Sequence, residues 1–176
     1  MDPAAPRHTK EMPHDTFPAA PPAQPAMTEP LILYATMTGN ARDAAELLAS
    51  QLRNSGLAPR VEQIPAWDPR RLSQEKTVFF LTSTFGDGDP PDTAFTFWDI
   101  LRKADTLDLS GLRFAVVGFG DSTYPRFCKF GRDLDHRLAE LGAKRLLPRL
   151  DCDVDWEEPF EKWLPRAEKA IQQPES

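Results

Sequence analysis

Cysteine and histidine are scarce in this chain of 176 residues, which has two cysteines and three histidines. Cys128 and Cys152 are too few for a disulfide framework, and neither belongs to a Cys-x-x-Cys pair. We therefore predict that both are free thiols in a reducing compartment. Of the histidines only His136 follows residue 30, and Ser122 has no Gly-x-Ser-x-Gly setting. A nucleophilic triad is therefore not indicated, and we expect neither a catalytic residue nor a metal ligand.

The chain also lacks long apolar runs and an excess of positive charge. No segment is long and apolar enough to span a bilayer or to serve as a signal peptide. A formal net charge of −6 argues against nucleic acid, which would favour a basic surface. We therefore expect a soluble, cytoplasmic protein that binds neither membrane nor nucleic acid. Frequent proline and few large apolar groups predict a disordered tail at residues 1–29, which leaves residues 30–173 for one domain.

After the tail, apolar runs alternate with amphipathic helical patterns. Short runs rich in Val, Ile, Leu and Phe, typical of buried parallel strands, fall at residues 31–35, 60–64, 77–81, 114–117 and 145–150. The helical stripes between and after them are Ala44, Leu47, Leu48 and Leu52; Ala94, Trp98 and Leu101; Leu134, Leu138 and Leu141; and Phe160, Trp163, Leu164, Ala167 and Ile171. This alternation predicts an α/β sheet with helices on both faces, whose ligands sit beyond the carboxyl ends of the strands.

The loop after the first predicted strand has the composition of a phosphate site without a cation. It reads Thr-Met-Thr-Gly-Asn-Ala at residues 36–41. Hydroxyls and free N–H groups at the start of a helix bind anions well. A Walker loop would need Gly-x-x-x-x-Gly-Lys-Ser/Thr, and this loop has no lysine. It is therefore suited to hold a phosphate and not to transfer it. The alternative is that Thr38 or Asn40 only caps the helix.

The loop after the third predicted strand, residues 83–92, combines an aromatic side chain with two glycines that let backbone approach a ligand. Its aspartates raise the alternative of calcium. A calcium-binding loop that starts at Asp87 would need a carboxylate at its twelfth position, where Trp98 stands, so calcium is not favoured. A plain tight turn, with Pro91 starting a helix, is the structural alternative.

The loop after the fourth predicted strand, residues 118–128, is also rich in glycine. Thr123 stands at the third glycine of Gly-x-Gly-x-x-Gly, and the loop does not follow the first strand, so the dinucleotide fingerprint is not matched. Tyr124 leaves the same predicted sheet edge as Phe85, although a buried tyrosine is usually part of the core. Two aromatics across a crevice, beside a phosphate anchor, suit a flat ring that bears a phosphate.

These motifs resemble those of a known family. The stretches "TMTGNA", "STFGDGDPPD" and "FGDSTYPRFCKFGRDLDHRLAELG" are similar to the FMN domain of the diflavin reductases, and most similar to the flavoprotein subunits of NADPH–sulfite reductases. The resemblance runs from about residue 30 to the last helical stripe. It implies FMN as cofactor and a flavodoxin-like, doubly wound, five-stranded parallel sheet of order 2-1-3-4-5.

The resemblance also implies which residues contact the cofactor. The phosphate would be held by Thr36, Met37, Thr38, Gly39, Asn40 and Ala41. One side of the isoalloxazine ring would be lined by Ser83, Thr84, Phe85 and Gly86. The other side would be lined by the run of residues 119–128, with Tyr124 stacked on the ring. The contacts named within this run are Phe119, Gly120, Asp121, Ser122, Thr123, Tyr124, Phe127 and Cys128. Phe85 stands where microsomal members often have tyrosine, so it would cover the ring without offering a hydroxyl.

The resemblance further implies an electron carrier. A complete diflavin reductase continues into an FAD- and NADPH-binding module, which this sequence does not contain. We therefore expect electrons to come from a separate FAD/NADPH reductase and to leave to a redox acceptor protein. The alternatives are an FMN-dependent reductase of a small acceptor, the FMN domain of a larger NADPH-dependent diflavin (sulfite) reductase, and a flavin protein whose Pro-rich tail binds a partner.

Carboxylates are frequent in the loops at the predicted edge of the ring. A fully reduced flavin tends to be anionic, so nearby carboxylates would lower the potential of the second electron. They would also form an acidic face on which an acceptor protein docks, or else only a solvated surface. This predicted acidic rim consists of Asp87, Asp89, Asp92, Asp121, Asp151, Asp153, Asp155, Glu157 and Glu158.

Overall fold

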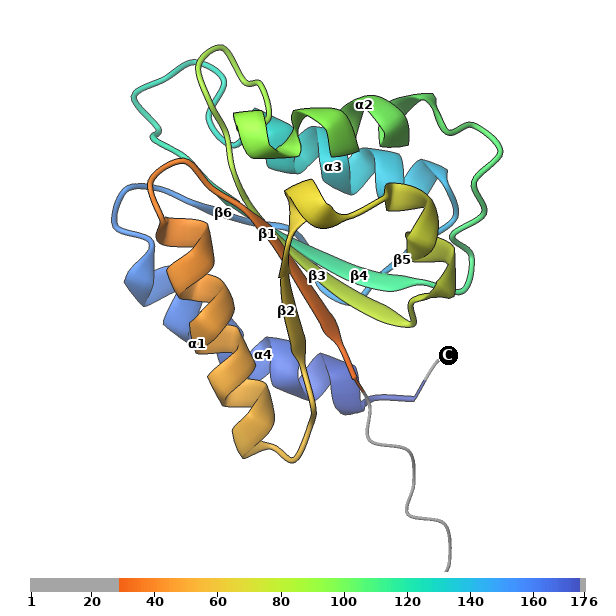
Figure 1. Cartoon of the computed structure of the whole chain (residues 1–176). Coiled ribbons are helices and arrows are strands. Elements are labelled where there is room, and N and C mark those ends of the chain that lie inside the picture. The colour runs from red at the N-terminus through yellow and green to blue at the C-terminus, as the bar shows by residue number, and fades with distance from the viewer. Residues whose placement is uncertain (1–28, 175–176) are drawn as a thin grey trace, which may run out of the picture.

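The computed structural model describes residues 29–174, so all of the predicted tail except Glu29 lies outside the described residues. A parallel sheet forms the centre, in the order β2-β1-β3-β4-β5, with β6 also paired to β4 (Figure 1). The predicted order 2-1-3-4-5 is therefore confirmed. The strands are β1 (Leu31–Ala35), β2 (Arg60–Gln63), β3 (Thr77–Ser83), β4 (Arg113–Phe119), β5 (Lys144–Arg145) and β6 (Leu150–Cys152).

Helices cover both faces of this sheet, as the sequence predicted. On one face lie α1 (Asn40–Asn54) and α4 (Glu157–Gln172), and on the other lie α2 (Phe95–Lys103) and α3 (Lys129–Glu140) (Figure 1). The short 3-10 helices η1 (Ile64–Ala66), η2 (Pro69–Gln74) and η3 (Asp92–Ala94) contribute buried residues to the α2/α3 side. Within residues 29–174, no helix is long and apolar enough to cross a membrane.

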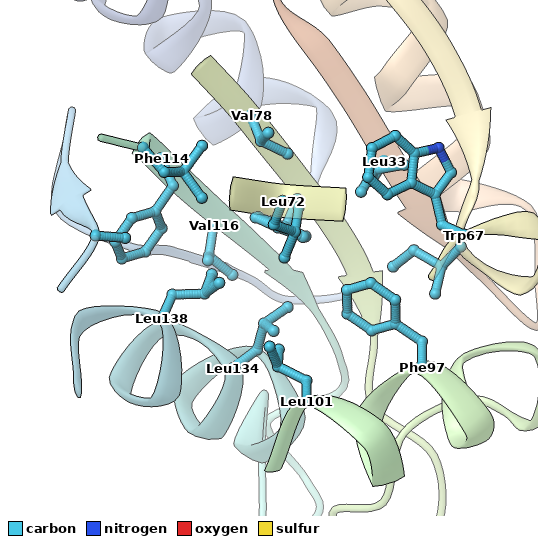
Figure 2. Close-up of a cluster of buried hydrophobic side chains, with 14 of the residues drawn as sticks. Leu33, Trp67, Leu72, Val78, Phe97, Leu101, Phe114, Val116, Leu134 and Leu138 are labelled. Atoms are coloured by element: carbon cyan, nitrogen blue, oxygen red, sulfur yellow. The ribbon is translucent and has the colours of Figure 1, made fainter. Parts of the chain in front are cut away.

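Each face of the sheet has its own hydrophobic core, because successive residues of a strand point to opposite faces. In β3, Phe79 belongs to the core under α1 and α4, while Phe80 belongs to the core under α2 and α3. Figure 2 shows the second core, where Val116 of the sheet meets Leu134 and Leu138 of α3. Full burial of such a side chain stabilises the fold by about 1.5–3 kcal/mol.

The buried stripe of α1 differs from its prediction at one residue. Ala44, Leu48 and Leu52 are fully buried against the sheet, but Leu47 is 45% exposed. The buried surface of α1 is completed instead by alanines, namely Ala41, Ala45 and Ala49. Small side chains let the helix lie close to the sheet, and Leu47 falls outside this narrow stripe.

The prediction of one continuous fifth strand at residues 145–150 was wrong, because this segment contains parts of two short strands with a gap between them. β5 ends at Arg145 and β6 begins at Leu150, and both pair with β4. Pro148 lies in the interruption, where a proline has no N–H for the ladder. Arg145 and Arg149 both reach the buried Asp135 of α3, at 2.8 and 3.8 Å. These ion pairs hold the edge of the sheet where the ladder is interrupted.

Candidate functional site

A cavity of about 510 Å³ opens at the carboxyl edge of the sheet, where the loops after β1, β3, β4 and β6 meet. Its volume falls within the range of about 300–1,000 Å³ that small-molecule sites occupy. Parallel strands place all of these loops at one edge, as the sequence analysis expected. The cavity is lined by Met37, Thr38, Asn40, Ser83, Thr84, Phe85, Gly86, Phe119, Gly120, Asp121, Tyr124, Arg126, Phe127, Cys128 and Val154.

Most of the residues proposed to contact the cofactor line this cavity. The exceptions are Thr36, Gly39, Ala41, Ser122 and Thr123, which belong to the same loops but do not line it. One lining residue, Val154, was not predicted from the sequence. It follows β6, and the mistaken fifth strand did not show where that strand ends. Arg126 lies inside the predicted run of residues 119–128 but was not named as a separate contact.

The loop after β1 leaves the start of α1 open toward the cavity. Gly39 is the residue that precedes the helix, with a φ of 100° that favours glycine, and its N–H donates to the Thr36 hydroxyl at 2.9 Å. In the described part of the chain, no side chain caps α1, so the reading of Thr38 or Asn40 as a cap is wrong. The first N–H groups of the helix thus remain available to an anion.

The loop after β3 is a tight turn that presents an aromatic ring. Phe85 and Asp89 exchange backbone hydrogen bonds of 2.8 and 2.9 Å across the turn. Gly88 has a φ of 100°, and a Cβ there would lie 2.5 Å from Cδ of Lys129, so only glycine fits. The turn leaves Phe85 51% exposed at the cavity. The predicted tight turn is therefore present, and η3 begins just after Pro91.

The loop after β4 carries Tyr124 on a constrained backbone. Tyr124 is 61% exposed, so the reading of this residue as core is wrong. Cys128 has a φ of 52°, a left-handed conformation that is uncommon for a residue with a side chain. A Cβ on Gly120 would lie 3.1 Å from the Phe127 ring, so a larger residue here would have to displace that ring by a few tenths of an ångström. Such local strain is concentrated at functional sites.

Hydrogen bonds join these loops into one unit. The hydroxyl oxygens of Thr36 and Ser83 lie 3.4 Å apart, which connects the first loop to the end of β3. The Arg126 guanidinium Nη1 donates to the carbonyl oxygen of Asp87 at 2.9 Å, which connects the third loop to the Phe85 turn. The walls of the cavity are therefore fixed relative to one another.

The loop after β6 is held by a carboxylate. Oδ1 of Asp153 accepts from the N–H groups of Ser122 and Val154, at 3.0 and 2.8 Å. Hydrogen bonds from the Ser122 side chain and from these N–H groups lower the pKa of Asp153 below its usual value. Asp153 thus positions Val154 at the cavity and is not simply a charge on its rim.

Two more members of the acidic rim are engaged by cations. Asp151 pairs with Arg149 at 2.8 Å, and Glu158 pairs with Lys162. Six members remain, of which Asp121 is partly buried and accepts hydrogen bonds from the N–H and the hydroxyl of Thr123. Among the ion pairs of residues 29–174, none involves the five exposed members: Asp87, Asp89, Asp92, Asp155 and Glu157. We refer to these five as the free acidic rim.

The chemistry of the cavity fits a flat, apolar ring that carries a phosphate. Four large hydrophobic side chains that are about half exposed or more, Met37, Phe85, Tyr124 and Val154, all converge on it. Exposed apolar groups that line one concave site indicate that a ligand covers them. The uncapped start of α1, beside the Thr38 hydroxyl, supplies an anion-binding end to the same cavity.

Comparison with known proteins agrees with this geometry. The flavodoxin family model matches residues 32–163. The "Sulfite reductase [NADPH] flavoprotein alpha-component" of Bacillus subtilis (strain 168) is 41% identical over 143 residues, which is 81% of this chain and 24% of that protein. The protein of the same name from Thiocapsa roseopersicina is 39% identical over 81% of this chain and 27% of its own length. The chain thus spans about a quarter of these relatives.

Solved flavodoxins have the same fold. The flavodoxin of Streptococcus pneumoniae TIGR4 superposes with a TM-score of 0.72 at 31% identity, over 81% of this chain and 97% of its own. Oxidised Flavodoxin 1 of Bacillus cereus gives a TM-score of 0.74 at 28% identity, over 84% of this chain and 99% of its own.

Proposed function

The chain belongs to the flavodoxin family, and we propose that it carries electrons from a separate NAD(P)H-dependent flavin reductase to an acceptor protein. It is an FMN-binding electron-transfer domain, as in the relatives it matches. The donor and the acceptor are the proposed part. The observation that carries the proposal is the cavity at the carboxyl edge, which joins an uncapped helix start to two exposed aromatics, Phe85 and Tyr124.

FMN, when bound, supplies the redox chemistry, and the protein supplies binding, orientation and electrostatics. The Thr38 hydroxyl and the first N–H groups of α1 would bind the phosphate. Phe85 and Tyr124 would cover the ring from the β3 and β4 loops and exclude water from it. Their exposure leaves the cavity open at the surface, where a partner protein has to approach for electron transfer.

The free acidic rim supports an acceptor protein of opposite charge. Its carboxylates lie in the loops after β3 and β6 and at the start of α4, which meet at the carboxyl edge. Complementary charge steers electron-transfer partners into register more than it adds affinity. A basic patch around the acceptor's own redox centre is therefore the surface that we expect to dock here.

The names of the relatives suggest a class of acceptor. Both relatives are called flavoprotein components of an NADPH-dependent sulfite reductase, so we propose a sulfite-reducing partner as acceptor. The second candidate is the same domain within a longer NADPH-dependent reductase, which the 24% and 27% coverage of these relatives favours. A cytoplasmic setting belongs to the proposal, because the buried thiols Cys128 and Cys152 are free.

The proposal is tested by purifying the chain and identifying its flavin. We expect one FMN per chain, identified by chromatography of the flavin released on denaturation. We expect negligible NADPH oxidation by the chain alone and rapid reduction of its flavin once a flavin reductase is added. Bound FAD, the absence of flavin, or fast NADPH oxidation by the isolated chain would each contradict the proposal.

A further inference from the structure

We propose that Arg126 raises the reduction potential of the bound flavin by placing a fixed positive charge at the cavity. This inference rests on the proposed function and deepens it, because it identifies a residue that tunes the carrier's potential. The expected effect of Arg126 is opposite to that of the surrounding carboxylates, which on their own would lower the reduction potential.

Arg126 is the one lysine or arginine among the described residues that line the cavity. Its backbone belongs to the loop that carries Tyr124, and its guanidinium reaches the turn that carries Phe85. The contact is made by Nη1, which donates to the carbonyl oxygen of Asp87 at 2.9 Å. The guanidinium is therefore held at the wall of the cavity by this hydrogen bond, although the side chain is exposed.

The aliphatic part of Arg126 is also constrained. A Cβ placed on Gly88 would lie 3.2 Å from the Cβ of Arg126, so the turn backbone packs closely against the base of this side chain. A side chain held at its base and at its guanidinium loses little further freedom when the ligand changes charge. A preorganised charge of this kind acts on the ring without the cost of reorganising.

The positive charge of Arg126 is not neutralised by a partner carboxylate. Within residues 29–174 its hydrogen bond goes to a neutral carbonyl, and it forms no ion pair. The acidic residue that lines the same cavity, Asp121, accepts hydrogen bonds from the N–H and the hydroxyl of Thr123, at 2.9 and 2.6 Å. Asp121 and Arg126 thus act on the ring with opposite signs.

The effect of this cation depends on the redox state of the ring. An oxidised ring is neutral and gains little from a nearby charge, whereas a reduced, anionic ring is stabilised by it. Because Arg126 is exposed, water and salt weaken the interaction, and we expect it to favour reduced FMN by about five- to tenfold. The ratio of the two affinities determines how far the potential of bound FMN departs from that of free FMN.

The test compares the full chain with its Arg126→Gln variant by two measurements. Titration of the flavin-free proteins gives the affinity for oxidised FMN, and spectroelectrochemical titration of the loaded proteins gives the potential. We expect the affinity for oxidised FMN to stay within about twofold, while the affinity for reduced FMN falls about five- to tenfold. Oxidised and fully reduced FMN differ by two electrons, so a tenfold change in the ratio of these affinities corresponds to about 30 mV in the two-electron potential.

Two further variants separate the charge from the loop contact. Arg126→Lys keeps the charge and should restore most of the potential. Arg132→Gln is the matched control, because Arg132 donates to the carbonyl of Phe127 at 3.0 Å in the same loop but does not line the cavity. We expect its potential to equal that of the unaltered chain.

Equal losses of affinity for oxidised and reduced FMN in Arg126→Gln would overturn the inference, because Arg126 would then only link the two loops. An unchanged potential in that variant, or a failure of Arg126→Lys to restore the potential, would overturn it as well. In each of these cases FMN is still bound, so the proposed function stands. An unaltered chain that binds no FMN would instead remove the proposed function and this inference with it.

Discussion

The hydroxyl oxygen of Thr36 lies 3.4 Å from that of Ser83, in a contact that joins the loop after β1 to the end of β3. The same Thr36 oxygen accepts a hydrogen bond from the N–H of Gly39 at 2.9 Å. Thr36 therefore shapes the loop, whereas Thr38 lines the cavity and is exposed. Of the two threonines, Thr38 is therefore the one whose hydroxyl is available to a phosphate.

Replacing Thr38 by alanine should weaken FMN binding more than riboflavin binding, because riboflavin has no phosphate. A lost hydrogen bond to a charged group costs on the order of 1.5–3 kcal/mol. Fluorescence titration of the flavin-free protein measures both affinities. Since Thr38 does not cap α1, the thermal midpoint of the flavin-free protein should not change.

Thr96→Ala is the matched control for this substitution, because Thr96 is an exposed threonine on α2 outside the cavity. It should leave both affinities unchanged. If Thr38→Ala weakened FMN and riboflavin equally, the hydroxyl would not serve the phosphate.

Replacing Tyr124 by alanine should weaken FMN binding and brighten the fluorescence of the flavin that remains bound. A stacked aromatic pair contributes about 0.5–1.5 kcal/mol beyond the area it buries. Because Tyr124 is 61% exposed, unfolding of the flavin-free protein should be unaffected. Phe95 offers the control, since it is 60% exposed but lies outside the cavity, and Phe95→Ala should change neither FMN affinity nor fluorescence. Unfolding of Tyr124→Ala without flavin would place Tyr124 in the core.

The strand order and the lining of the cavity were largely predictable from local patterns. Short apolar runs identify buried parallel strands, and the composition of the loop after each strand indicates whether that loop can contact a ligand. The fifth strand was mistaken because residues 145–150 were read as one apolar run, although Pro148 interrupts the ladder between β5 and β6. The ion pairs of Arg145 and Arg149 with Asp135 of α3, which accompany this interruption, depend on the packing of the helix and leave no local pattern in the sequence.

Three features of the site also depend on contacts that the sequence does not show, namely the place of Val154, the contact of Arg126 and the role of Asp153. Val154 lies just after β6, so its place became predictable only with the correct end of that strand. The tuning role that we propose for Arg126 depends on where its guanidinium goes, to the carbonyl of Asp87, which sequence spacing does not determine. Asp153 looked like a rim charge, but two N–H groups that it accepts from make it a structural residue.

The two cysteines should resist thiol reagents in the native protein. Burial raises the pKa of Cys128 and of Cys152 from 9.0 to about 12, so both thiols stay protonated at pH 8. The thiolate is the reactive form, so Ellman's reagent should label neither residue until urea unfolds the chain, and then both. Rapid labelling of the native protein would contradict this.

The raised pKa of these two thiols also determines whether the free energy of unfolding rises or falls with pH. Because the folded pKa lies above the unfolded value, the native state holds more protons between pH 9 and pH 12. The contribution of these thiols to stability is thus complete below about pH 9 and declines as the pH rises toward 12. Cys152→Ala should reduce this decline, as measured by urea unfolding at several alkaline pH values.

Neutralising Asp155 and Glu157 together should make electron transfer less sensitive to salt. Both belong to the free acidic rim, and neither holds a loop as Asp153 does. Their charges would steer a basic partner, and added salt screens exposed charges over a Debye length of about 10 Å at 0.1 M. Stopped-flow reduction of the acceptor over a range of salt concentrations measures the effect, which we expect to be slower transfer at low salt with unchanged FMN content.

The control for this pair makes the same change in net charge elsewhere. Glu46→Gln with Glu161→Gln removes two exposed carboxylates within α1 and α4, outside the loops at the carboxyl edge. If the rim docks the partner, the control should keep the salt dependence of the unaltered chain, because only charges near the contact steer the encounter. Equal flattening in both variants would show that net charge alone matters. If the rate of electron transfer did not depend on salt in any variant, the rim would be only a solvated surface with no part in docking.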